Sequence, residues 1–236
     1  ALSSYISMQL DYATYGEGEE QTKGETLAAL MTPIAKAFFT DLGFENTVAG
    51  QQVFGGHGYI REWGQEQLVR DARITQIYEG TNGIQAMDLL MRKVAGSKGA
   101  MLKVFTDEVN TFIESHKNDE TMSEFIKPLA AAVDDLTELT TDLLSKSQDD
   151  INELGASAND YLHVFGYTAM AFVWAKMAQV SLTQQQNNGE SGEAFYQSKL
   201  HTARYFFTRL LPRRVSLIAA AKSGSDCLFA IDDELF

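Results

Sequence analysis

Residues 125–143 read FIKPLAAAVDDLTELTTDL, and this stretch decides the fold class. Its apolar residues recur at steps of three and four, a spacing that places them on one face of an α-helix. They are Phe125, Leu129, Ala132, Val133, Leu136, Leu139 and Leu143. A second stretch repeats the pattern with Leu154, Ala158, Tyr161, Phe165, Ala169, Phe172 and Met177. We therefore predict an all-α protein.

The flanking sequence supports further helices separated by polar or glycine-rich breaks. Helices are expected at 3–15, 27–42, 45–53, 65–74, 84–94 and 194–221, with loops at 16–26, 55–64, 78–83 and 184–193. Pro33 predicts that its helix is kinked there or begins nearby, and Pro212 predicts a second kink. The small residues AGSKG at 95–99 indicate a domain boundary. We expect a helical domain at 1–96 and an appended helical domain at 97–236.

Composition excludes several classes of function. Nineteen Lys and Arg against 32 Asp and Glu give a formal charge of −13, which argues against non-specific binding to nucleic acid or an anionic membrane. Cys227 is the only cysteine, so an internal disulfide or cysteine-rich zinc site is ruled out. The histidines outside the glycine-rich segment have no metal-ligand spacing. We find neither a signal peptide nor a run of eighteen apolar residues, and expect a cytoplasmic protein without membrane insertion.

Residues 51–85 carry the chemistry: QQVFGGHGYIREWGQEQLVRDARITQIYEGTNGIQ. Glycines 55, 56 and 58 could bring backbone amides close to a phosphate. They do not form GxGxxG, because Arg61 occupies the third glycine position. The alternative is a tight turn between helices. Arg70, Asp71 and Arg73 are interpreted as an ion-paired structural cluster.

Glu79 lies in a helix-breaking turn just before an expected helix. A carboxylate there can project free of its own backbone into a cleft, as a general base must. The alternative is an acidic residue that favours the positive end of a helix. Thr81 or Asn82 can cap this helix, and Asn82 with Gln85 resembles a capping box.

The segment resembles the C-terminal signature of the acyl-CoA dehydrogenases. The matching elements, in order, are Gln52, Gly55-Gly56-His57-Gly58-Tyr59, Glu62, Arg70-Asp71-Ala72-Arg73 and Ile77-Tyr78-Glu79-Gly80-Thr81. Residues 31–45 and 97–236 resemble longer members with appended helices, among them the 3-methylmercaptopropionyl-CoA dehydrogenases. The family's N-terminal helical and middle β-domains have no counterpart here. The resemblance thus implies the C-terminal part of a larger enzyme.

The resemblance also implies roles. Glu79 matches the base that removes an α-proton from an acyl-CoA, while a hydride passes from the β-carbon to FAD and a trans-2-enoyl-CoA forms. Tyr78 matches a wall of the acyl pocket, and Gly80 is assigned with it to the substrate. Thr81 matches a hydroxyl on the flavin, while Gln52, Gly55 and Gly56 match contacts to the FAD of a neighbouring subunit.

Electron-transfer flavoprotein is the acceptor that the resemblance implies, and a homo-oligomer is expected. The expected subunit contact includes the apolar faces of 27–42 and 84–94. The alternative hypothesis is a non-catalytic helical interaction module that keeps the signature only as scaffold.

Overall fold

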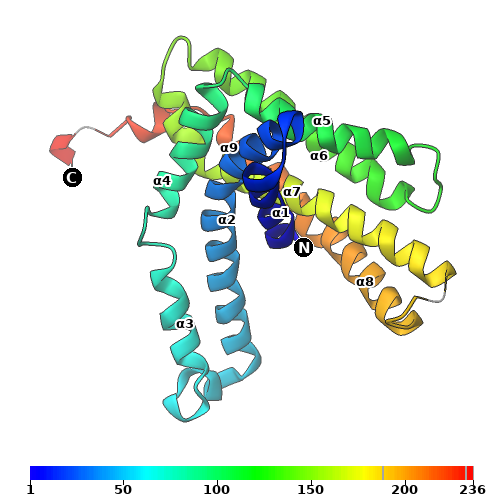
Figure 1. The fold of residues 1–236 in the computed structure, drawn as a ribbon. Coiled ribbons are helices and arrows are strands. Elements are labelled where there is room, and N and C mark those ends of the chain that lie inside the picture. The colour runs from blue at the N-terminus through cyan, green and yellow to red at the C-terminus, as the bar shows by residue number, and fades with distance from the viewer. Residues whose placement is uncertain (188, 232, 236) are drawn as a thin grey trace.

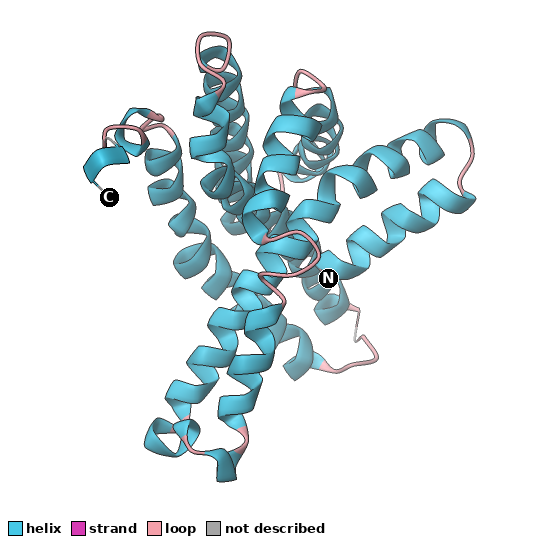
Figure 2. Cartoon of the chain, turned by 90° about the vertical axis from the view of Figure 1, so that its left-hand side faces the viewer, coloured by secondary structure: helices cyan, strands magenta, loops and turns pink. Residues whose placement is uncertain are grey.

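The computed structural model describes residues 1–187, 189–231 and 233–235, and across them it contains helices and no strand (Figures 1 and 2). The all-α prediction is confirmed. The long elements are α1 (Leu2–Tyr15), α2 (Gly18–Val53), α3 (Gln65–Ile74), α4 (Asn82–Met87), α5 (Ala100–His116), α6 (Ser123–Lys146), α7 (Asn152–Gln186), α8 (Glu193–Tyr205) and α9 (Arg214–Ala221). Shorter elements link or follow them, namely 3₁₀ turns η1 (Gly55–Tyr59), η2 (Arg61–Trp63), η5 (Leu211–Arg213), η6 (Asp226–Leu228) and η7 (Asp233–Leu235), and π-helical stretches η3 (Asp88–Ala95) and η4 (Phe206–Leu210).

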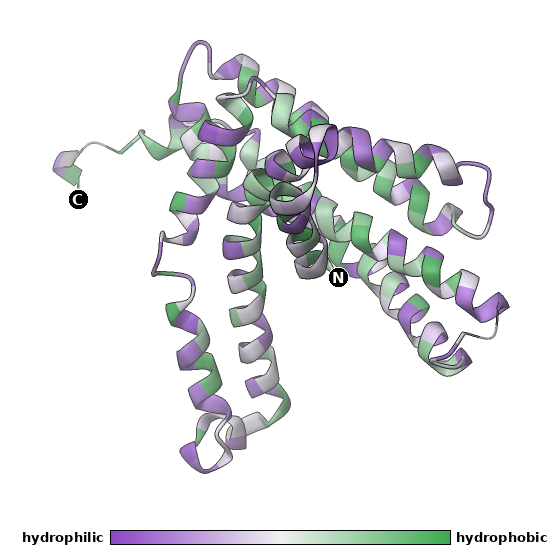
Figure 3. Cartoon of the chain, viewed as in Figure 1, coloured by the Kyte–Doolittle hydropathy of each residue, from purple (hydrophilic) through white to green (hydrophobic). Residues whose placement is uncertain are grey.

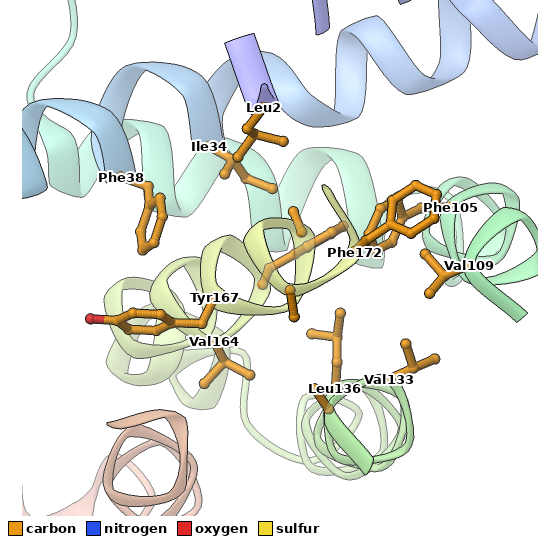
Figure 4. Packing of buried hydrophobic residues seen from close by; sticks show 14 of the residues in the cluster. Leu2, Ile34, Phe38, Phe105, Val109, Val133, Leu136, Val164, Tyr167 and Phe172 are labelled. Carbon is orange, nitrogen blue, oxygen red and sulfur yellow. The ribbon is translucent and has the colours of Figure 1, made fainter. Parts of the chain in front are cut away.

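Helix α7 forms the centre of the molecule. Figure 4 shows it between α2, α5 and α6, with Val164, Tyr167 and Phe172 pointing towards different neighbours. For example, Phe172 makes edge-to-face contacts with both Tyr5 and Phe105, at ring-centroid distances of 5.9 and 6.1 Å. A helix that is apolar around its whole circumference is stable only when other elements surround it. The fold is therefore organised around α7.

The core continues across the predicted boundary between residues 96 and 97. Ile34 and Phe38 of α2 are fully buried in the same apolar cluster as Phe165 of α7. The division into 1–96 and 97–236 stays a prediction, and the two segments share one core.

A protruding pair of helices departs from this core. We call residues 43–74 the arm: the distal part of α2, the turns η1 and η2, and α3 (Figures 1 and 2). Beyond Phe38 no residue of α2 is buried, and none of α3 is. Figure 3 shows apolar residues along the arm, and the large exposed ones are Val48, Val53, Phe54, Tyr59, Ile60, Trp63, Leu68 and Ile74.

Two expectations for α2 are wrong. The predicted loop at 16–26 is mostly helical, and the helices predicted at 27–42 and 45–53 are one helix that runs through Pro33. Gly24 shows why the sequence misleads: a Cβ there would lie 2.7 Å from the backbone nitrogen of Ala13. The glycine permits close packing of α1 against α2 and does not mark a loop.

By length and composition, α2 is long and apolar enough to cross a membrane. Core helices of soluble proteins pass the same test, and here Leu27, Leu30 and Met31 are fully buried within the described chain. The absence of membrane insertion stays a prediction.

Candidate functional site

The residues assigned to proton abstraction lie in a closed loop between α3 and α4. The backbone N–H of Asn82 donates to the carbonyl of Gln76 at 3.1 Å and so closes the neck of the loop. We call residues 76–82 the 76–82 loop. Near its middle, Glu79 and Gly80 have φ angles of +52° and +83°. A glutamate in the left-handed region is strained and persists only where its surroundings fix the backbone.

The side chains at the tip of this loop face outwards. Tyr78, Glu79 and Thr81 are all exposed, Tyr78 by 47%. Thr81 immediately precedes α4, yet its side chain makes no capping hydrogen bond. The tip therefore presents a carboxylate, a phenol and a hydroxyl to whatever lies beside it.

Asn82 does not form the predicted capping box. Its side chain is buried and turns towards α2, where Oδ1 accepts from Lys36 Nζ at 2.7 Å and Nδ2 donates to Asp41 Oδ1 at 2.6 Å. A buried amide needs hydrogen-bond partners, and this one finds them on the neighbouring helix α2 rather than at the start of its own helix. Asn82 thus fixes the start of α4 to α2.

Asp41 is the acceptor for both ends of the loop. Gln76 Nε2 donates to Asp41 Oδ1 at 2.7 Å, beside the bond from Asn82, while His163 Nε2 of α7 lies 3.0 Å from Asp41 Oδ2. Burial opposes ionisation of this carboxyl, but the bonds from His163, Gln76 and Asn82 outweigh it and hold the pKa of Asp41 below its usual value. Asp41 is therefore an ionised acceptor at neutral pH.

Sequence reasoning missed this cluster. Its members come from α2, the 76–82 loop and α7, at positions 41, 76, 82 and 163. No local pattern links residues so far apart. The one available signal was the polar residue Asp41 beside the buried face of a long helix.

The residues assigned to the cofactor fall into two separate groups. Gln52, Gly55 and Gly56 are exposed near the far end of the arm, whereas Thr81 lies beyond α3 in the 76–82 loop. The ten residues of α3 separate them, a helix length of about 15 Å. The structure brings Tyr78, Glu79, Gly80 and Thr81 together, and it does not bring the first group to them.

The glycine-rich segment is more ordered than the predicted irregular loop. It forms η1 and η2, and Gln51 Nε2 donates to the carbonyl of Gly58 at 3.2 Å. Gly55 has a φ of +60°, and a Cβ at Gly55 or Gly56 would meet nothing within 4 Å. An outside group therefore has room to approach this backbone closely.

The ion-paired cluster expected at Arg70, Asp71 and Arg73 is wrong. Among the described residues none of the three forms an ion pair, and Arg73 donates to Gln76 Oε1 at 3.0 Å. Residues one or two apart on a helix do not face each other, which explains the failure. Across all the residues that the structure describes, no group of three His, Cys, Asp or Glu side chains could hold a metal ion.

Comparison with known families places the chain. It matches the family described as acyl-CoA dehydrogenase, C-terminal domain, over residues 14–95, and the family described as acetyl-CoA dehydrogenase C-terminal like over residues 105–232. The chain therefore belongs to the acyl-CoA dehydrogenase family, as the signature indicated.

Individual relatives agree with the family. The chain is 32% identical to the 3-methylmercaptopropionyl-CoA dehydrogenase of Ruegeria pomeroyi over 86% of its own length and 34% of the relative. It is 25% identical to the broad-specificity linear acyl-CoA dehydrogenase FadE5 of Mycobacterium tuberculosis over 88% of its length and 35% of that protein. The chain thus spans about a third of the curated relatives it matches.

A solved structure shares the fold. Caenorhabditis elegans ACDH-11, crystallised in complex with C11-CoA, superposes with a TM-score of 0.69 and 18% sequence identity. The match covers 97% of this chain and 37% of that protein. The likeness therefore extends through α1 to α9 and identifies the architecture.

Proposed function

We propose that this chain is the C-terminal part of an FAD-dependent acyl-CoA dehydrogenase, in which Glu79 removes the α-proton of an acyl-CoA to yield the trans-2-enoyl-CoA. The observation that carries the proposal is the 76–82 loop. It holds an exposed carboxylate on a left-handed turn and closes its own neck with a backbone hydrogen bond. Family membership supports it further.

The α-C–H of a thioester is a weak acid, so its carbonyl must be polarised as the proton leaves. An aimed backbone N–H stabilises such developing charge, and we assign this role to the N–H of Glu79. Tyr78 and Gly80 flank the carboxylate and would contact the acyl chain. Together these groups would orient the substrate and accept its proton.

The residues assigned to FAD fit an anionic, hydroxyl-rich group. Gly55 and Gly56 offer open backbone, and the hydroxyl of Thr81 and the amide of Gln52 are exposed. When bound, FAD would take up the hydride from the β-carbon. Because the whole of α3, a helix about 15 Å long, separates Gln52, Gly55 and Gly56 from Thr81, we propose that they serve the cofactor site of another subunit. Electron-transfer flavoprotein is the proposed acceptor, and the cytoplasm the proposed compartment.

Replacing the proposed base tests the function. In the complete enzyme, we expect Glu79→Gln to lower kcat by about 10⁴-fold or more, with FAD content unchanged, because glutamine cannot accept the proton. Glu120→Gln, at an exposed carboxylate in the α5–α6 connection, is the matched control and should keep full activity. The measurement is steady-state acyl-CoA oxidation with an artificial electron acceptor.

The outcomes separate this function from the alternative of a non-catalytic interaction module. A mutant that retains more than about a tenth of its kcat, a loss below roughly 1.4 kcal/mol, shows that Glu79 is not the base. A complete protein that binds FAD yet oxidises no acyl-CoA favours the module.

A further inference from the structure

We propose that Asp41 and His163 are positioning residues for the 76–82 loop, and that the C-terminal helices thereby set the orientation of the base. This inference rests on the proposed role of Glu79. We call Asp41, Gln76, Asn82 and His163 the Asp41 clamp. Its bonds join α2, both ends of the loop and α7 through one carboxylate.

The clamp acts at the neck, where it has most control over the tip. Gln76 and Asn82 both donate to Oδ1 of Asp41, at 2.7 and 2.6 Å. Their backbones are joined to each other at 3.1 Å. Only four residues besides Glu79 lie between these two anchors. A fixed neck therefore restricts the strained turn at Glu79 to few conformations.

A carboxylate suits this position because of its acceptor capacity. An ionised carboxylate accepts through both oxygens and donates nothing, so it can bind three N–H donors at once. An amide at position 41 would present N–H groups to at least one of those donors. The charge and acceptor capacity of the carboxylate, and not only its shape, therefore account for an aspartate at position 41.

His163 supplies the connection to the core. Its neighbours Leu162 and Val164 are fully buried, and its ring lies edge-on against Phe38 at a centroid distance of 5.6 Å. Its Nε2 therefore has little freedom when it binds Asp41 Oδ2. Because α7 belongs to the segment 105–232, that segment is linked to the 76–82 loop through Asp41 and does more than cover α2.

The test measures catalysis and loop mobility in the same variants of the complete enzyme. We expect His163→Ala to lower kcat about tenfold to a hundredfold, the range that a displacement near 1 Å produces, with KM for acyl-CoA changed less than about twofold. Amide hydrogen exchange in peptides covering 76–82 should accelerate at least about tenfold, as a loosened neck opens more often. Asp41→Asn should show changes of the same kind.

Two controls separate positioning from simple destabilisation. Val164→Ala removes buried volume one residue from His163 without touching the clamp; it should lower the melting temperature and leave kcat and loop exchange unchanged. His163→Gln retains an N–H donor and should restore most of kcat. If Asp41→Asn fails to fold, the His163 pair still decides.

The outcomes are distinct from those for Glu79. Loop exchange that stays at the wild-type rate in His163→Ala overturns the proposal, and so does faster exchange with unchanged kcat. Should Glu79→Gln remain active, the proposed function fails, while hydrogen exchange still reports whether the clamp holds the loop.

Discussion

At the residue scale, Gly80 is the position where backbone conformation and the proposed chemistry meet. Its φ is +83°, and a Cβ would lie 2.8 Å from Nε2 of Gln85. We expect Gly80→Ala to cost about 1–2 kcal/mol of unfolding free energy, since a left-handed alanine is strained. Because Glu79 is its neighbour, kcat should fall by about tenfold or more. Urea titration and steady-state kinetics check both effects.

Gly83 provides the matched control for this substitution. It lies in the first turn of α4, and a Cβ there would meet nothing within 4 Å. Alanine favours a helix over glycine by about 1 kcal/mol, so Gly83→Ala should leave stability equal or higher and kcat unchanged. Equal losses in the two variants would contradict the special role of Gly80.

At the scale of elements, Gly166 determines how closely α7 approaches α2. A Cβ at this position would lie 2.5 Å from Cδ2 of Phe38, whose side chain is fully buried. We expect Gly166→Ala to destabilise the protein by about 1–3 kcal/mol, because an extra methyl group in a packed core displaces its neighbours. Gly155→Ala in the same helix, where a Cβ meets nothing within 4 Å, should not destabilise. Chemical denaturation of both variants settles the comparison.

The sequence pattern predicted several of the observed helices. Helix α3 begins and ends at the predicted residues, and α6 and α7 contain the two predicted apolar stretches. The single helix expected at 194–221 with a kink at Pro212 is divided in the structure into α8, η4, η5 and α9, with Pro212 in η5. By contrast, α5 has no equivalent among the expected helices. Apolar spacing therefore located α6 and α7, whereas α5 was missed although it buries Leu102, Phe105 and Val109 on one face.

The candidate site also has one part that the sequence predicted and one part that it did not. A contiguous signature made the outward-facing residues 78–81 predictable. The Asp41 clamp was not predictable, because it forms only when α2 and α7 are packed against the loop. The signature carried information about what the loop presents, and the tertiary packing decides how the loop is held.

At the scale of the whole molecule, the arm combines several large exposed apolar side chains with the absence of buried residues in α3 and in α2 beyond Phe38. Leu27, Leu30, Ile34 and Phe38, expected at a subunit contact, are fully buried in the core. Ile84 and Met87 are exposed by 56% and 41%. The apolar surface available to a partner therefore includes the arm and the outer face of α4.

This distribution predicts self-association of the 236-residue chain. Exposed apolar patches favour contact with another protein surface, and a symmetric dimer is the commonest closed arrangement. The net charge of −13 opposes association only weakly, since screening at physiological salt acts over about 8 Å. We expect sedimentation equilibrium at micromolar concentration to give a dimer or larger species. Leu68→Lys, on the exposed face of α3, should shift the population towards monomer. A wild-type mass near 26.1 kDa would contradict the prediction and show that the arm needs other partners.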